Sequence, residues 1–311
     1  AVYAFKYIHG GEANLNLDLQ GSNTINTTNK TTYGMRLGSC NVTMQGEGSL
    51  NIKPTDATSV GFEAASLTVN LPESRKFDVD VSYESASRNH CYGINAGEFT
   101  LNSGTVTVKA VNKVFDESWP CPSAGICTKK ATVNGGKLTV NATHTVAEGK
   151  AYGVYGQSVY NDQKKAYDYI AETALNGGVV DISGGTAAIY STTAPVVANN
   201  LVFWAGQTAD RSDRAAYDPE KFNSYLYLTS VHSHCICGAT QMHEEKVDCS
   251  YYSYHAETLE PWSNAAALPT YGYYYLTTNV TLSSTWKVTS SVTLCLNGHS
   301  ITANGDFDAA V

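Results

Sequence analysis

Residues 92–108 read YGINAGEFTLNSGTVTV, and this stretch contains both features that decide the fold. It opens with an aromatic-glycine-aliphatic triplet, and it continues with apolar and polar residues that alternate, break at glycine and resume. Successive side chains of a strand point to opposite faces. Four apolar residues therefore fall on one face: Phe99, Leu101, Val106 and Val108. The pattern predicts half-buried strands joined by a tight turn.

A triplet of this kind, in which glycine stands between a tyrosine or aliphatic residue and another apolar residue, recurs along the chain. Its copies are Tyr33-Gly34-Met35, Val60-Gly61-Phe62, Tyr92-Gly93-Ile94 and Tyr152-Gly153-Val154, with Tyr3-Ala4-Phe5 as an earlier one. The steps between the four glycine copies are 27, 32 and 60 residues, and the last is about two repeats. A unit of this size, made of short strands and turns, cannot bury its apolar face alone. We therefore expect the copies to stack.

The fold that fits is a right-handed parallel β-helix, an all-β solenoid whose stacked coils share one core. A β-sandwich would need hairpin turns and Greek-key spacing without a repeated triplet. A propeller would need repeats of about 40 residues or more with a blade motif of its own. Both alternatives fit the repeat less well.

The composition favours strands and turns. Charged residues make up 15% of the 311 residues and hydrophobic residues 42%. The net charge of -8, without a Lys/Arg cluster, offers nothing to hold a phosphate backbone, and no apolar run is long enough to span a bilayer. We expect neither nucleic acid nor membrane insertion. Both ends read as cut from a longer chain, so we expect a monomeric segment of a larger protein.

The pattern predicts three regions. Residues 1–230 form the parallel β-helix, with insertions at about 115–130 and 157–176. The second insertion contains the one predicted helix, which Asn161 or Asp162 would cap and Gly177 would end. Residues 231–262 form a Cys/His-rich linker. Residues 263–311 form a second, truncated β-strand repeat module, the start of a second β-helix.

The linker carries the densest set of metal-ligand residue types. Cys235-x-Cys237-Gly238 is a tight turn that can present two thiolates to one soft ion, and histidines nearby can complete a tetrahedral zinc site. The candidate ligands are Cys235, Cys237, His243, His232, His234 and Cys249. A structural disulfide is the alternative. Either would stabilise a linker that has few apolar residues.

Other cysteines and acids have simpler interpretations. Cys121 and Cys127 are close enough in sequence for a local disulfide that closes a loop. Cys40, Cys91 and Cys295 lie in strand patterns and are expected to be buried as small hydrophobic residues. Asp78 and Asp80 leave one strand on the same face, as a calcium or acid cluster would require, or as an ordinary solvated face.

Carbohydrate binding requires aromatic platforms for the apolar faces of sugars, together with hydroxyl partners. The chain has 21 tyrosines and 4 tryptophans. Those in the insertions are the stronger candidates, because insertions on a solenoid often form its binding face. They are Trp119, Tyr160, Tyr167 and Tyr169.

The C-terminal third resembles a known family. HSHCICG at 232–238, Pro261-Trp262, LPTYGYYYLTTNVTLSSTW and LCLNGHSI are similar to a segment of large repetitive surface proteins of Gram-positive gut bacteria, called adhesin-like or carbohydrate-binding-domain-containing proteins. WAGQTADRS is similar to the segment that closes the preceding β-helix in them. The resemblance implies a secreted, cell-wall-associated or surface-displayed protein.

The sequence therefore predicts a non-catalytic adhesin-like module that binds a host or dietary glycan or a host protein. Two alternatives stay open. Parallel β-helices also carry polysaccharide lyases and glycoside hydrolases, which need calcium-binding or paired carboxylates. A third reading is a structural spacer of a large surface protein.

Overall fold

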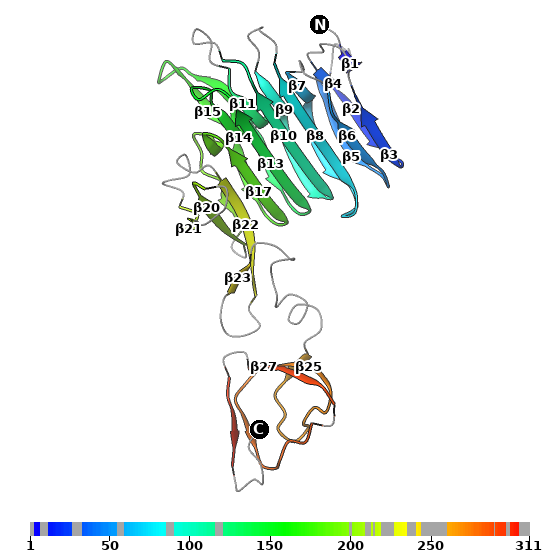
Figure 1. Ribbon diagram of the computed structural model, residues 1–311, viewed down its shortest axis with the longest axis vertical. Coiled ribbons are helices and arrows are strands. Elements are labelled where there is room, and N and C mark those ends of the chain that lie inside the picture. Colours follow the sequence, from blue (N-terminus) through cyan, green and yellow to red (C-terminus); the bar gives the residue numbers. More distant parts are fainter. Residues whose placement is uncertain are drawn as a thin grey trace. The chain divides into compact units, whose positions relative to one another are not determined.

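The computed structural model describes residues 3–6, 12–26, 33–54, 59–84, 90–115, 121–198, 201–208, 213, 215–218, 227–234, 241–243, 260–288, 290–296 and 299–304. All regular elements in these ranges are β-strands (Figure 1). The described residues thus include no helix that could cross a membrane. The chain divides into two compact units, residues 1–230 and 231–311.

Unit 1 is a parallel β-solenoid with three ladders of strands. The first ladder contains β1 (Tyr3–Lys6), β4 (Tyr33–Arg36), the first half of β7 (Val60–Asn70), the first half of β9 (Cys91–Ser103), β11 (Ser123–Thr128), the first half of β14 (Ala151–Asn161) and β18 (Ala187–Tyr190). The second contains β2 (Ala13–Asp18), β5 (Cys40–Gln45), the second halves of β7 and β9, β12 (Lys130–Val133), β16 (Glu172–Leu175) and β19 (Val196–Val197).

The third ladder contains β3 (Ser22–Ile25), β6 (Ser49–Ile52), β8 (Lys76–Tyr83), β10 (Thr105–Asn112), β13 (Lys137–His144) and β17 (Val179–Gly184). Its later strands run side by side in Figure 1. Every pair within the three ladders is parallel, so the chain passes through each ladder once per coil. The predicted parallel solenoid is confirmed.

The core is a single apolar column inside the coils. Phe99, Leu101, Val106 and Val108 are all 1% exposed or less, as their alternation predicts. The rings of Phe62 and Phe77 meet edge to face, with centroids 5.6 Å apart, and join the first ladder to the third. Burial of such side chains contributes about 1.5–3 kcal/mol each, so the column is the main source of stability.

The triplet glycines stack in the first ladder. A Cβ on Gly93 would lie 2.2 Å from Val108 Cγ1 and 2.7 Å from the carbonyl oxygen of Gly125. Glycine is thus required where the first ladder approaches the β-branched side chains of the third. Gly125, in Ala124-Gly125-Ile126, is the copy missing from the 60-residue step.

The predicted insertion at about 115–130 is therefore wrong for its second half, which is strand rather than loop. Ser123–Thr128 is the strand β11, in register with Cys91 on one side and Ala151 on the other. All six of its residues are buried. Both faces of this strand are covered, so its small residues do not alternate between apolar and polar. The sequence pattern that indicates the other strands is therefore absent here.

A row of asparagines marks the corner between the second and third ladders. The Asn102 amide donates to Asn70 Oδ1 at 2.7 Å, and the Asn134 amide donates to Asn102 Oδ1 at 2.8 Å. The Asn176 amide continues the row to Asn134 Oδ1 at 2.9 Å. Shortly after one of these corners, Gly136 adopts a positive φ of 72°, which glycine tolerates best. The asparagine row therefore continues from coil to coil, although the strand register shifts at Asn70.

Antiparallel strands follow the last coil of unit 1. β22 (Tyr227–His234) pairs antiparallel with β17, and β20 (Leu201–Gly206) lies next to β22 in the same sheet. β21 (Ala215–Ala216) pairs antiparallel with β20, and β23 (Gln241–His243) pairs antiparallel with β22. The parallel stacking of the third ladder therefore ends at β17.

Unit 2 is small and also contains parallel pairs. β24 (Glu260–Trp262), β25 (Gly272–Leu276) and β27 (Val292–Cys295) form one sheet, and β26 (Val280–Leu282) pairs with β28 (Ile301–Ala303). Trp262, Leu276, Val280 and Leu282 form its core. The rings of Trp262 and Trp286 lie 5.3 Å apart between centroids.

Candidate binding groove

A β-hairpin stands out from the solenoid where the sequence predicts a helix within 157–176. The second half of β14 pairs antiparallel with β15 (Ala166–Ile170), from Gln157 opposite Ile170 to Asn161 opposite Ala166. The helix prediction is wrong. Tyrosines at every second position, Tyr167 and Tyr169, favour a strand because they share one face there.

The turn of the hairpin explains why a helix cap was expected at Asn161. Asn161 Oδ1 accepts hydrogen bonds from the backbone N–H groups of Gln163 and Lys164, both at 3.1 Å. A helix cap makes bonds of the same kind. Here the chain reverses instead at Lys165, which has a positive φ of 52°. The side chain of asparagine serves both structures, so the local signal is ambiguous.

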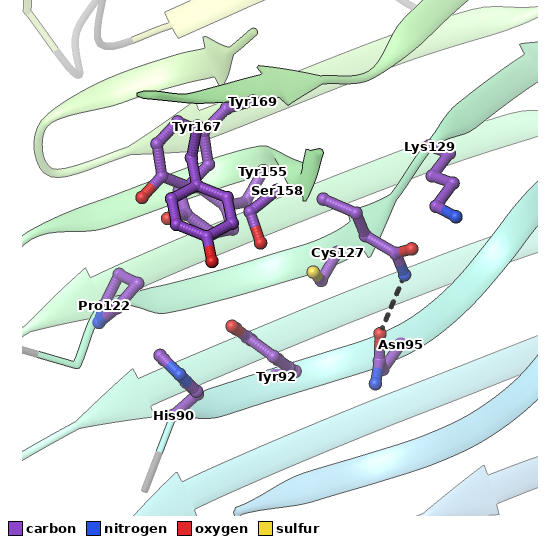
Figure 2. Close-up of a pocket in the computed structure, with 11 residues that line it drawn as sticks. His90, Tyr92, Asn95, Pro122, Cys127, Lys129, Tyr155, Ser158, Tyr167 and Tyr169 are labelled. Carbon is purple, nitrogen blue, oxygen red and sulfur yellow. Dashed lines mark hydrogen bonds between the residues drawn. The ribbon is translucent and has the colours of Figure 1, made fainter. Parts of the chain in front are cut away.

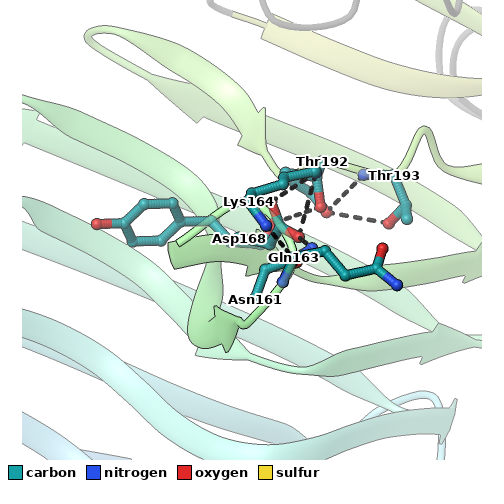
Figure 3. A network of polar contacts seen from close by, with 8 residues as sticks. Asn161, Gln163, Lys164, Asp168, Thr192 and Thr193 are labelled. Carbon is teal, nitrogen blue, oxygen red and sulfur yellow. Dashed lines mark hydrogen bonds and ion pairs between the residues drawn. The ribbon is translucent and has the colours of Figure 1, made fainter. Parts of the chain in front are cut away.

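Polar contacts fix the hairpin at its tip and its base (Figure 3). Asp168 accepts hydrogen bonds from Asn161 Nδ2 at 2.7 Å and from Lys164 Nζ at 3.0 Å, and these bonds lower the pKa of Asp168. At the base, Thr192 donates its backbone N–H at 2.7 Å and its hydroxyl at 3.0 Å to the carbonyl oxygen of Tyr169. The hairpin is thus tied to the segment after β18.

Four tyrosines pack between the hairpin and the first ladder. The ring centroids of Tyr155 and Tyr169 lie 5.4 Å apart, as do those of Tyr169 and Tyr190. Tyr152 is 4.7 Å from Tyr190 and 5.1 Å from Tyr155. Each contact of this kind contributes about 0.5–1.5 kcal/mol beyond its buried area. The cluster holds the hairpin at a fixed place over β14 and β18.

The hairpin and the outer surface of the first ladder enclose a groove of about 800 Å³, which we call the tyrosine groove (Figure 2). Tyr167 and Tyr169 come from β15, Tyr155 from β14 and Tyr92 from β9. Between the last two lies β11, which contributes the small side chain of Cys127. The surface dips here because a strand of small residues lies between strands that carry tyrosines.

Polar groups line the rest of the groove. Gln157 Nε2 donates to Asn95 Oδ1 at 3.2 Å, across the strand that holds Cys127. The His90 ring stacks on Tyr92 with centroids 5.1 Å apart. Among the lining residues that the structure describes, Lys129 is the one lysine, arginine, aspartate or glutamate. The groove therefore combines aromatic rings, amides and a single fixed charge.

Burial keeps the floor of the groove uncharged. It raises the pKa of the Cys127 thiol to about 12, against a hydrogen bond with Tyr92 that lowers it. It also raises the pKa of the Tyr92 hydroxyl, and the nearby Cys127 raises it further. Burial lowers the pKa of His90 below its ordinary value of 6.5. At neutral pH all three groups are neutral.

The other face of the hairpin borders a second hollow of about 530 Å³, to which Val159 and Ile170 contribute. Here Lys130 lies between Glu98 and Glu172 in the register of the second ladder. Opposite charges on adjacent strands attract one another, so the charge of Lys130 is balanced by its neighbours. The hairpin separates this charged row from the tyrosine groove.

The predicted glycan-binding tyrosines are gathered on one face of the hairpin. Tyr160 and Tyr167 are directly opposite each other, with ring centroids 5.3 Å apart and exposed fractions of 49% and 62%. Trp119 lies outside the described residues. Sequence reasoning missed Tyr92 and Tyr155. The repeat itself contains the signal, because register places the triplets at 92 and 152 two strands apart once the copy at 124 is recognised.

The predicted zinc ligands are described only in part. Cys235, Cys237 and Cys249 lie outside the described residues. The backbone register places His232 opposite His243, and His234 opposite Gln241, in the pair β22–β23. Among the residues that the structure describes, no group of three or more His, Cys, Asp or Glu could hold a metal ion. Zinc stays a prediction.

The structure does not gather carboxylates at the predicted calcium position. In register, Asp78 lies between Asn51 and Thr107, and Asp80 lies beside Lys109. The ordinary solvated strand face therefore fits these aspartates better.

The predicted loop disulfide between Cys121 and Cys127 is not formed, and both are buried as thiols. The reason is that Cys127 belongs to the strand β11, whose register fixes it beside Tyr155. Cys40, Cys91 and Cys295 are buried, as expected for small hydrophobic residues.

The fold and the site together define a parallel β-solenoid with an aromatic surface groove. No protein-family model matches the chain, and comparisons with curated proteins and with solved structures found no match.

Proposed function

We propose that the tyrosine groove binds a glycan chain without altering it. The observation that carries the proposal is the convergence of Tyr155, Tyr167 and Tyr169 on one open groove beside uncharged hydrogen-bonding groups. Sugars present apolar C–H faces, which pack on aromatic rings, and hydroxyl groups, which need polar partners. Because Tyr155 and Tyr169 are held by the tyrosine cluster, little side-chain entropy of these two residues is lost when a ligand binds.

Polar groups are placed to meet sugar hydroxyls. The side-chain amides of Asn95 and Gln157 line the groove and are joined by one hydrogen bond. Ser158, on the same hairpin face as the tyrosines, adds a hydroxyl of its own. The groove thus offers both kinds of contact that a sugar ring needs.

A polysaccharide lyase or hydrolase is the competing function, and the groove favours it less. Hydrolysis requires paired carboxyl groups beside the scissile bond. Among the described residues that line the tyrosine groove there is no aspartate or glutamate. The second hollow contains two glutamates, Glu98 and Glu172, but Lys130 lies between them in the register of the ladder. Release of reducing ends from a bound glycan would establish the enzyme instead.

The proposal extends to the setting of the domain. The surface-protein resemblance of residues 200–305 supports an adhesin-like module of a bacterial surface, with unit 1 as a right-handed coil. The parallel pairs of unit 2 support a second solenoid that begins there. A zinc ion or a disulfide in the 231–262 linker would stabilise the connection. Elemental analysis of the purified protein for zinc tests that last point.

The test is a glycan array, with affinities of the hits measured by calorimetry for the wild type and for Tyr167→Ala. We expect the substitution to weaken binding by about tenfold, since an aromatic contact is worth about 1.4 kcal/mol. Tyr167 is 62% exposed, so the fold should tolerate the change. Tyr271→Ala is the matched control, because Tyr271 is 70% exposed in unit 2 and should not affect binding.

Two results would contradict the proposal. One is a glycan array on which the protein binds nothing although circular dichroism shows that it is folded. The other is binding that Tyr271→Ala and Tyr167→Ala weaken equally, because the ligand would then not occupy the groove.

A further inference from the structure

We infer that the tyrosine groove selects acidic glycans, whose sugars carry a carboxylate or a sulfate, and that Lys129 is the residue that selects them. The inference rests on the proposed function and adds to it the charge of the ligand. It follows from the balance of charges in the groove.

Lys129 is the one lysine, arginine, aspartate or glutamate among the described residues that line the groove, and on its other side it borders the second hollow with Glu98 and Glu172. Its side chain is exposed, and it takes part in none of the ion pairs among the described residues. No carboxylate of the described residues lines the groove with it. The whole chain has a net charge of -8, but in physiological salt exposed charges more than about 8 Å apart are largely screened. The local positive charge therefore decides what the groove attracts.

The backbone around Lys129 is fixed on both sides. Its N–H donates to the carbonyl oxygen of Gly97 at 3.0 Å, and its carbonyl oxygen accepts the N–H of Glu172 at 2.8 Å. Lys129 lies at the junction of β11 and β12, where it borders both hollows. In Figure 2 its side chain lies on one side of Cys127 and the hairpin tyrosines lie on the other. A sugar chain stacked on the tyrosines would thus extend toward the ammonium group.

The neighbouring lysine shows that this arrangement is specific. Lys130 does not line the tyrosine groove, and its register partners Glu98 and Glu172 provide carboxylates on both sides. Two lysines that are adjacent in sequence therefore have different electrostatic settings. Lys130 has a glutamate on each side in the ladder, whereas Lys129 stands between two strands and borders the tyrosine groove, which no described carboxylate lines.

The probes are a galacturonic acid tetramer and its fully methyl-esterified form, in which a neutral methyl ester replaces each carboxylate, together with sialylated and sulfated glycans and their neutral parents. Each is titrated into the wild type, Lys129→Gln and Lys130→Gln at low and physiological salt. We expect wild-type affinity for at least one acidic probe to exceed that for its neutral partner by about tenfold, the value of a charged hydrogen bond. Lys129→Gln should remove this difference and its salt dependence, whereas Lys130→Gln should keep both.

The outcomes separate the inference from the proposed function. Equal binding of the acidic and neutral members of every pair, with dependence on Tyr167, overturns the selection by charge and leaves glycan binding in place. Equal losses in Lys129→Gln and Lys130→Gln also overturn it, because the charge would then act at long range. If no probe binds in a way that depends on Tyr167, both the inference and the proposed function are overturned.

Discussion

Gly125→Ala tests whether the stacked glycines hold the first ladder against the third. A Cβ at this position would lie 2.1 Å from Val140 Cγ1 and 2.8 Å from the carbonyl oxygen of Gly153. Carbon atoms in contact are normally about 3.5–4.0 Å apart, so Val140 would have to move by about 1.5 Å. Overpacking of this kind costs about 1–3 kcal/mol. Alanine recovers about 0.4–1 kcal/mol by restricting the unfolded chain.

Because strands on two sides resist the shift, the overpacking cost should lie near the upper end of its range, about 3 kcal/mol, so that the expected net loss in the free energy of unfolding is about 2 kcal/mol. Urea unfolding followed by circular dichroism measures it. Gly185→Ala is the control, since the only atom near its added Cβ is Ala151 Cβ at 3.5 Å. Adding Val140→Ala to Gly125→Ala removes the closest clash, so a double-mutant cycle should show a favourable coupling of about 1 kcal/mol. A Gly125→Ala protein as stable as the wild type, or a cycle without coupling, would refute the packing argument.

Two further predictions concern polar contacts. Asn102→Ala interrupts two hydrogen bonds of the asparagine row and should lower the free energy of unfolding by about 1 kcal/mol in urea titrations; an unchanged midpoint would show that the row is incidental. The pKa of Asp168 is lowered in the folded protein, so its stabilisation of the hairpin is present above the ordinary pKa of 3.8 and is lost as pH falls through the folded value. Tyrosine fluorescence between pH 5 and 2 should report this loss in the wild type, and a transition that persists in Asp168→Asn would assign it to another group.

The solenoid could be predicted because its apolar column repeats. Phe99 and Val106 are in the core for the reason that the alternation indicates. β11 could not be predicted in the same way. A strand that is buried on both faces has no alternation, and Ala124 stands where the copies at 33, 92 and 152 have tyrosine. The hairpin was mistaken for a helix because Asn161 makes hydrogen bonds that suit either structure.

Only the part of the candidate site whose residues lie close together in the sequence could be predicted. The hairpin tyrosines are adjacent in sequence and could be proposed as a group. Tyr92 and Tyr155 are 63 residues apart, and only the register of β9, β11 and β14 brings them to one groove. The same register, which gives Lys130 two acidic neighbours, cannot be known before the missing copy at Gly125 is placed.

The hairpin leaves and rejoins its coil at neighbouring points, since Gln157 is opposite Ile170 in the sheet. The stacking of the rungs thus continues past it from β14 to β18 and from β12 to β16. Evolution, or an engineer, can therefore replace residues 157–170 as a cassette and change what the surface recognises without redesigning the scaffold beneath it.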